Sequence, residues 1–494
     1  MTRRFRLAAL CLLATFGCPA LAAPDSPGQA QRQAVETLAA AVEADTGLEL
    51  LPRALLTQTG FALPPPPTLA PLPPRGDSAV TTERFDLRIV LGLLAQAFGH
   101  EDNSAVLAAQ AENGTHAQMI TRGSLTLAEL ARVMGDGALS GAGVLELRAP
   151  LILWHDAELR LAPGEVLRLS RQHGAFILNF GRLIVDGARV QGANGASPHN
   201  EEFTPFITTS GPGTLQMRDA RVSDLGFGST VKFSGLSVAR APLDRPAATS
   251  FNTNSLNERV RRISVQAARG MVLDNNRIAD AGSAALVILQ SFDTEVTANL
   301  IGGRSDTNAI RVLDGSIGTR IAGNAILEGD RVGILIRNTA TGTAVDGNIV
   351  WNRDGSGIKI DRAKCTRLSR NLLIGNQQKG IEVRRSLEAL LSGNFLVSNR
   401  SAGIWISGQP RGAVTRLEDN VLDANGSGLA TATAAAIALD GNDFSDQFPK
   451  FLDGDIAAQS RYVATDLKGR AALALDASGP VRITDLPSHC AGAL

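Results

Sequence analysis

The sequence has few aromatic residues and no net charge. Its 494 residues include 17 Phe, 3 Trp and 1 Tyr but 50 Gly, so aliphatic side chains and turns must supply most of the structure. Lys and Arg number 48, as do Asp and Glu, and this balance argues against wholesale binding to nucleic acid or to an anionic membrane. No apolar run after the first 22 residues is long enough to span a bilayer. We therefore expect neither a nucleic-acid partner nor a membrane span.

Cysteine is also scarce. Two of the four cysteines lie within the first 22 residues, which leaves Cys365 and Cys490. This number and spacing predict no disulfide framework. The pair His489-Cys490 lacks the further ligands that a zinc site needs, so we expect no metal and no cofactor.

The first 22 residues have the pattern of an export signal. Arginines at positions 3, 4 and 6 precede an apolar run from Leu7 to Phe16, and Ala20-Leu21-Ala22 offers a small-residue cleavage site. The mature protein is therefore expected in the periplasm.

A repeat of about 24 residues dominates the middle of the chain. Short β-branched runs separate the repeating positions, with no helical pattern between them. Such units cannot bury an apolar face alone and must stack on their neighbours, which predicts an all-β fold, a right-handed parallel β-helix. Its groove suits an extended polymer. One asparagine series and one small-residue series mark the repeat: Asn276, Asn299, Asn324, Asn348, Asn371, Asn394 and Asn420; Ala285, Ala309, Gly333, Gly357, Gly380, Gly403 and Gly428.

Four segments are expected along the chain: the signal at 1–22, a helical prefix at 23–117, the β-helix at 118–445 and a C-terminal cap and tail at 446–494. Within the prefix, apolar spacing predicts helices at 29–44 and 85–98, separated by a stiff proline-rich linker. Thr126-Leu-Ala-Glu129 predicts a capping box that opens a short helix ending at Met134.

The repeat also predicts which side chains face outward. The first and third residues after each small-residue marker are apolar and must point inward, because side chains alternate along a strand. The asparagines most simply form an internal ladder that satisfies backbone groups at each turn. The second and fourth residues then form two outward columns: Arg311, Lys359, Glu382 and Trp405; Leu313, Arg337, Asp361, Arg384 and Ser407.

Charge is unevenly distributed. From Ile301 to Arg416 there are 17 Lys and Arg against 9 Asp and Glu. A basic groove would favour a polyanionic ligand, whereas a solvated surface without a partner is the alternative. A cation held between turns by Asp306, Asp330 and Asp354 is a weaker possibility. His155-Asp156 is more simply a surface turn than a catalytic dyad.

Three phrases upstream of the repeats, together with the coils from Asn276 to Gly428, resemble a known family. The phrases are Arg171-Gln-His-Gly-Ala-Phe-Ile-Leu-Asn, Phe203-Thr-Pro-Phe-Ile207 and Asp224-Leu-Gly-Phe227. They are similar to phrases of the periplasmic mannuronan 5-epimerases of alginate biosynthesis. The resemblance implies a reaction that removes the proton on carbon 5 of mannuronate and returns one to the opposite face.

The sequence departs from that family at the catalytic centre. The family's base is the histidine of an Asp-Pro-His-Asp motif, and the matching strand is Arg311-Val312-Leu313-Asp314. Leu313 stands in place of the histidine, and an apolar side chain cannot accept a proton. The family's charge-neutralising arginine matches Asn338, although Arg337 is adjacent. Asp361-Arg362 does match an Asp-Arg pair of the following coil.

Three functions remain open. The first is a catalytically degenerate relative that binds an exopolysaccharide, expected to be a polyuronate, during periplasmic modification and export. The second is an active polyuronate epimerase or lyase, with Lys359, Arg362 and Asp314 as catalytic residues and Lys359 as base. The third is a structural or adhesin-like solenoid. Export or modification proteins are expected partners, and the expected substrate-binding residues are Arg311, Arg337, Asp361, Glu382, Arg384 and Trp405.

Overall fold

The structure is a computed structural model that describes most of the chain. The described residues are 27–45, 50–110, 114–141, 143–193, 195–241, 244, 248–303, 305–486 and 490. The predicted export signal at 1–22 lies outside them.

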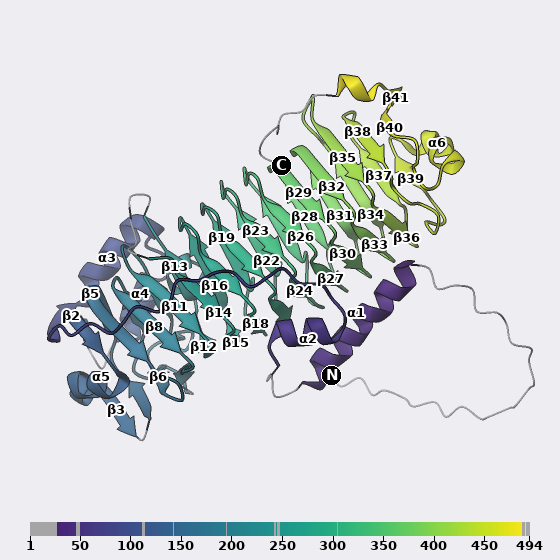
Figure 1. The fold of residues 1–494 in the computed structure, drawn as a ribbon. Helices are drawn as coiled ribbons and strands as arrows, with labels where there is room; N and C mark the ends of the chain where they lie inside the picture. The colour runs from purple at the N-terminus through teal and green to yellow at the C-terminus, as the bar shows by residue number, and fades with distance from the viewer. Residues whose placement is uncertain are drawn as a thin grey trace, which may run out of the picture.

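The chain winds into a parallel β-solenoid with three strand-bearing faces, as predicted (Figure 1). Successive coils pair in parallel along every face, and antiparallel pairs occur at the two ends. One face, called here the groove face, consists of β7 (Ile177–Asn179), β10 (Ile207–Thr209), β13 (Gly235–Ala239), β16 (Arg262–Gln266), β19 (Leu286–Leu289), β22 (Ile310–Leu313), β25 (Ile334–Arg337), β28 (Ile358–Asp361), β31 (Lys379–Arg384), β34 (Ala402–Ser407), β37 (Leu429–Ala432) and β39 (Leu452–Gly454).

Two further faces complete each coil. The second face consists of β8 (Arg182–Asp186), β11 (Thr214–Arg218), β14 (Phe251–Thr253), β17 (Val272–Asp274), β20 (Glu295–Thr297), β23 (Arg320–Ala322), β26 (Ala344–Asp346), β29 (Lys364–Ser369), β32 (Leu387–Ser392), β35 (Val414–Glu418) and β38 (Ala436–Asp440). The third face is a separate sheet of 13 strands. They are β3 (Ala138–Gly141), β4 (Val144–Leu147), β6 (Val166–Ser170), β9 (Arg189–Ala193), β12 (Arg221–Leu225), β15 (Leu256–Val260), β18 (Arg277–Ala279), β21 (Leu300–Gly302), β24 (Ala325–Ile326), β27 (Ile349–Trp351), β30 (Leu372–Ile374), β33 (Phe395–Val397) and β36 (Val421–Asp423).

The first coils open on two long strands, β2 (His116–Leu125) and β5 (Leu151–Leu161), of which β5 pairs with both β7 and β8. Between them, α5 (Leu127–Met134) begins at Thr126 with the predicted capping box: Thr126 accepts from the Glu129 amide, and the Glu129 side chain accepts from the Thr126 amide. This helix packs its apolar side on the end of the core.

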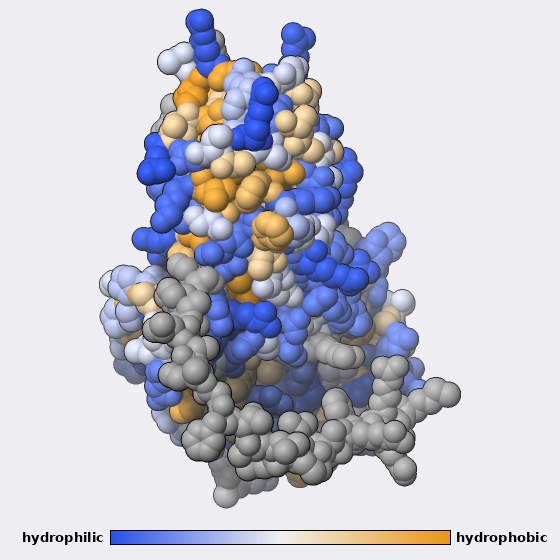
Figure 2. Space-filling model, turned by 90° about the vertical axis from the view of Figure 1, so that its right-hand side faces the viewer, coloured by the Kyte–Doolittle hydropathy of each residue, from blue (hydrophilic) through white to orange (hydrophobic). Residues whose placement is uncertain are grey.

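The core is aliphatic, as the composition predicts. The inward residues of the groove face, among them Val312, Ile336 and Ile360, are fully buried. On the face seen in Figure 2, hydrophilic side chains predominate and apolar ones form small patches between them.

The recurring asparagines form the predicted internal ladder. Asn348 is fully buried, and its Oδ1 accepts from the backbone amide and the Nδ2 of Asn324 at 2.9 and 2.8 Å. Its own Nδ2 donates to the carbonyl of Ile321 at 3.0 Å. The same bonds repeat from Asn299 to Asn442, so each coil fixes the turn of the coil before it.

A second ladder runs five residues after the first. Asn376, Asn399 and Asn425 are buried and bond in the same way, and Gln447 ends the series. At its start stands Arg353, which is 1% exposed and donates to the carbonyls of Leu327, Glu328 and Asp330. Burial lowers the pKa of Arg353 to about 10, which still keeps it charged at neutral pH.

Two N-terminal helices cover part of the third face. Helices α1 (Pro27–Ala44) and α2 (Pro52–Gln58) pack Leu38 and Leu55 on apolar residues of β21, β24, β27, β30 and β33 (Figure 1). Asp45 pairs with the buried Arg277, and Arg53 donates to Asp274 at 2.7 Å. No helix in the described part of the chain has the length and apolar character that a bilayer crossing requires.

The proline-rich segment after α2 runs along the solenoid toward its N-terminal end (Figure 1). Arg160 donates to the carbonyl of Pro73 at 2.6 Å, and Arg75 contacts Glu129 at 2.6 Å. The segment then enters β1 (Thr81–Asp86), which pairs antiparallel with β2. The helix predicted from 85 begins only at 87, because Asp86 serves as its N-cap and accepts from the Arg88 amide.

Helices α3 (Leu87–Phe98) and α4 (Asn103–Ala108) follow and pack on the groove face of the first coils. At the other end, β39 extends the groove face past residue 445. The cap comprises α6 (Ser460–Thr465), β40 (Leu473–Asp476) and β41 (Gly479–Val481).

The two cysteines that follow the predicted export signal form a disulfide, which the sequence analysis did not predict. Cys365 on β29 bonds to Cys490, 125 residues away, and both side chains are buried. The prediction was wrong because spacing along the chain carries no information about a terminus that folds back onto a coil. The bond fastens the C-terminal segment to the second face.

Replacing Asn348 by Ala should lower the free energy of unfolding by about 2–3 kcal/mol, because the Asn324 amide and the Ile321 carbonyl lose buried partners. Urea unfolding followed by circular dichroism measures the change. The exposed Gln377→Ala variant is the matched control, with an expected change below about 0.5 kcal/mol. Equal losses in both variants would contradict a stabilising ladder.

Removing the disulfide with Cys365→Ser should cost up to about 5 kcal/mol, because the unfolded chain regains the entropy of a 125-residue loop. Urea unfolding of the wild type with and without a reductant provides the measurement. The reduced wild type should match the variant. An unfolding midpoint that does not respond to reductant would show that the bond does not stabilise the fold.

Candidate functional site

The groove face presents the two outward columns that the repeat predicts. Strand pairing places Arg311, Leu335, Lys359, Glu382 and Trp405 in one line across successive coils. Arg337, Asp361, Arg384 and Ser407 form the second line. Neighbouring strands lie about 4.8 Å apart, so these side chains form a continuous surface.

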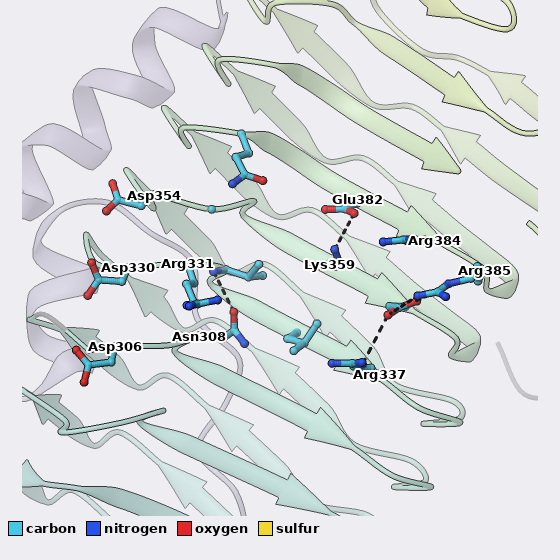
Figure 3. A pocket seen from close by; sticks show the side chains of 15 residues that line it. Asp306, Asn308, Asp330, Arg331, Arg337, Asp354, Lys359, Glu382, Arg384 and Arg385 are labelled. Atoms are coloured by element: carbon cyan, nitrogen blue, oxygen red, sulfur yellow. Dashed lines mark hydrogen bonds and ion pairs between the residues drawn. The ribbon is translucent and has the colours of Figure 1, made fainter. Parts of the chain in front are cut away.

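A cavity of about 820 Å³ opens on this surface (Figure 3). It includes five of the nine predicted site residues. Its walls come from β25, β28 and β31, from the turns that precede β22, β25, β28 and β31, and from the residue after β31: Asp306, Asn308, Asp330, Arg331, Val332, Leu335, Arg337, Asp354, Gly355, Lys359, Asp361, Gln378, Glu382, Arg384 and Arg385.

Lys359 and Glu382 form an ion pair on the floor of the cavity. The Lys359 Nζ lies 2.8 Å from Glu382 Oε1, and Ser356 donates to the other carboxylate oxygen at 3.2 Å. Glu382 is only 7% exposed. The amine of Lys359 is therefore engaged by a carboxylate and is not a free base.

Asp361 is surrounded by arginines. Arg385 donates to its Oδ1 at 2.9 Å from Nη2 and 3.2 Å from Nε. Arg337 and Arg362 approach Oδ2 at 3.6 and 3.8 Å. Since Asp361 is buried and the arginines are about 42% exposed, the carboxylate organises three cationic groups at the edge of the cavity.

Leu313 lies in an apolar cluster on the groove face. Its side chain is 8% exposed and contacts the cluster of Val287, Leu335 and Ala284. Burial among aliphatic side chains leaves no polar group at this position to exchange a proton.

Four predicted site residues lie outside the cavity lining. Arg311 is half-buried. Burial and, to a smaller extent, the nearby charge of Arg337 lower its pKa. Asp314 accepts from the Asn338 side chain at 2.9 Å, and Arg362 occupies the equivalent corner two coils after Asp314. Trp405 receives the Lys379 ammonium over its ring at 5.7 Å, a cation–π contact.

The sequence analysis considered three turn aspartates only as ligands of a cation and did not assign them to the binding site. Asp306, Asp330 and Asp354 form one column along the wall opposite Arg337 and Arg384 (Figure 3). Their 24-residue spacing was the available signal. No salt bridge joins any of the three to another described residue.

The charge of the cavity differs from the basic groove that the count over 301–416 predicts. Its lining has five basic and five acidic residues, so the cavity itself has no excess positive charge. The charges are partly segregated: Asp306, Asp330 and Asp354 lie on one wall, together with Arg331, and Arg337, Arg384 and Arg385 lie on the other (Figure 3). An anionic ligand would contact the arginine wall.

His155 and Asp156 lie on the surface, with Nδ1 and Oδ2 3.3 Å apart and both side chains more than half exposed. This geometry agrees with the surface interpretation of the pair.

Comparison with solved structures shows the fold. The periplasmic alginate epimerase AlgG matches with a TM-score of 0.66 and 18% identity, over 76% of this chain and 94% of that chain. A mutant of the same epimerase matches with a TM-score of 0.65 and 17% identity, over 76% of this chain and 94% of that chain. The mannuronan C-5 epimerase AlgE6 A-module of Azotobacter vinelandii has a TM-score of 0.44 and 13% identity, over 60% of this chain and 88% of that chain. The predicted resemblance is thus confirmed as a resemblance of fold: the chain is a parallel β-solenoid with the architecture of a periplasmic epimerase.

A family model described as "NosD: Periplasmic copper-binding protein (NosD)" matches residues 312–454. No curated protein matches the chain. Among the described residues, no group of three or more His, Cys, Asp or Glu side chains is arranged to hold a metal ion.

Replacing Asp361 by Asn should lower the free energy of unfolding by about 1–2 kcal/mol. Three arginines would then lack their shared carboxylate, and their partial exposure limits the loss. Urea unfolding measures it, with the exposed Asp354→Asn as control, for which less than about 0.5 kcal/mol is expected. An unchanged Asp361→Asn variant would mean that the arginines do not depend on this carboxylate.

Proposed function

We propose that this protein is an exported polysaccharide-binding β-helix protein that holds an anionic exopolysaccharide, of the polyuronate class, during periplasmic modification and export. The observation that carries the proposal is the large cavity on the groove face, lined almost entirely by charged and polar side chains. A cleft of this kind, open across several coils, suits a hydrated polymer better than a compact apolar ligand.

The proposal assigns binding to the arginine wall. Arg384 is exposed and has no salt bridge with another described residue, so its guanidinium is available to a carboxylate. Arg337 and Arg385 are oriented by Asp361 toward the same wall. Trp405, on the next strand along, offers an aromatic face to a sugar ring.

The proposal gives the protein no epimerase activity. Leu313 occupies the position at which the resemblance places the base, and it is buried in an apolar cluster. Lys359, the alternative base, is held in an ion pair with Glu382 at 2.8 Å. Proton abstraction from carbon 5 needs a free base within reach of the substrate.

The fold similarity to a periplasmic alginate epimerase and the match of residues 312–454 to a periplasmic family both support a periplasmic location. The disulfide between Cys365 and Cys490 supports it further, since such bonds persist in oxidising compartments.

The test of catalysis is incubation of the purified mature chain with polymannuronate in deuterated water, followed by proton NMR of the polymer. We expect binding with no change in the polymer. Deuterium at carbon 5 together with guluronate signals would show an active epimerase, and unsaturated chain ends would show a lyase. Either result would overturn the non-catalytic proposal.

The test of the binding surface is Arg384→Ala. We expect polymannuronate affinity to fall about three- to tenfold, about 1 kcal/mol, and the salt dependence to weaken. Arg189→Ala is the matched control, because Arg189 is exposed on the third face. Equal affinities for the Arg384 variant, the Arg189 variant and the wild type would remove the arginine wall from the proposal.

A further inference from the structure

The groove does not run the full length of the solenoid, because helices close it at the N-terminal end. The outward column that includes Arg311 continues through the earlier coils. There its first members, Met119, Ile152 and Leu178, are buried beneath the apolar sides of α3 and α4. A polymer cannot lie on these coils.

A short helical turn extends the cover over the next coils. Residues Val231–Phe233 form the turn η2, which lies over the column: Ser237 donates to the Val231 carbonyl at 2.6 Å, and Thr208 donates to the Lys232 carbonyl. Ser234, directly after the turn, contacts Ser264 at 2.8 Å. Thr208, Ser237 and Ser264 are at most 1% exposed.

Lys232 joins the two parts of this cover. Its Nζ donates to the Gly99 carbonyl and to the Asn103 side chain, both at 2.6 Å, so it connects η2 to the segment between α3 and α4. Asp102 accepts from the Ser229 amide at 2.9 Å on the same segment. The cover is therefore a fixed wall across the groove.

Three arginines lie near this wall: Arg262 and Arg311 on the groove face, and Arg261 in the turn before β16, where it lines a separate pocket with Asp224 and Asp280. Arg261 donates to the Gly228 carbonyl at 3.0 Å, and Arg262 donates to two carbonyls just before η2 at 3.2 and 3.3 Å. Arg311 lies two coils further along, and its buried Nε has no hydrogen-bond partner. In the described part of the chain none of these three arginines forms a salt bridge, in contrast to Arg337 and Arg385.

The arginines also disfavour one another's charge. Burial, with the charges of Arg311 and Arg261 adding to it, lowers the pKa of Arg262 to about 10. Like charges gathered in a partly buried place are stabilised by an anion, and guanidinium groups bind carboxylates in a directed, bidentate manner.

We propose that the closed end of the groove binds the terminal residue of a polyanionic polysaccharide, so that the protein takes chain ends and not internal stretches. The inference rests on the proposed function and adds to it the mode of binding. The wall stops the chain, and Arg262 and Arg311 receive the carboxylate of its last sugar. From β19 to the strand of Trp405 the groove spans five strand spacings, about 24 Å, which accommodates a short oligosaccharide.

The deciding experiment measures stoichiometry. Short and long size fractions of polymannuronate are titrated into the purified wild type, and sedimentation velocity gives the number of protein molecules bound to each chain. End recognition predicts the same small number for both fractions. A number that rises in proportion to chain length would overturn end recognition and leave the proposed function standing. Absence of binding to both fractions would overturn the proposed function and this inference together.

A single substitution tests whether the end of the polysaccharide binds at the wall. Arg262→Gln should weaken the binding of short and long fractions by the same factor, about tenfold, with circular dichroism unchanged. Arg189→Gln, on the exposed third face, is the matched control. Affinity for either fraction that equals that of the control would show that the terminal sugar does not bind at the wall.

Discussion

The structure depends on the hydrogen bonds that connect each coil to the next. Backbone pairing alone would allow coils to slip, but a buried asparagine at each turn bonds to specific groups of the preceding coil. A slipped coil would leave amides unpaired in an apolar core, at a cost of about 1–3 kcal/mol per group. The two ladders therefore fix the register, and the register places each outward side chain in its column.

The outward residues of the groove face have two different roles along the solenoid. Over the first coils its outward residues are apolar or small and serve as a docking surface for α3, α4 and η2. Over the middle coils most of them are charged, and several line the cavity. The change from one use to the other occurs between β16 and β22, where Arg262 and Arg311 stand. A single repeated scaffold thus supplies both a wall and a binding surface.

Structural features that repeat along the chain were predictable from the sequence, and features that occur only once were not. The period of Asn276 to Asn420 was enough to predict the solenoid, the ladder and the inward and outward positions of every strand from β19 to β34. The second ladder at Asn376, Asn399 and Asn425 keeps the same period and was within reach of the same argument. The bond between Cys365 and Cys490 could not be predicted, because spacing along the chain does not show which segments meet. The position of α3 could not be predicted either, because an apolar stripe on a helix does not specify which face of a solenoid it covers.

Helices α1 and α2 are synthesised well before the strands on which they pack. Asp45 follows α1 and pairs with Arg277, 232 residues later in the chain. Since synthesis begins at the N terminus, α1 and α2 exist long before the third-face strands that receive them. An unfinished chain must carry these helices with their apolar sides uncovered, and only a nearly complete solenoid can shelter them. The apolar sides of α1 and α2 can therefore be covered only after the chain up to β33 has been made.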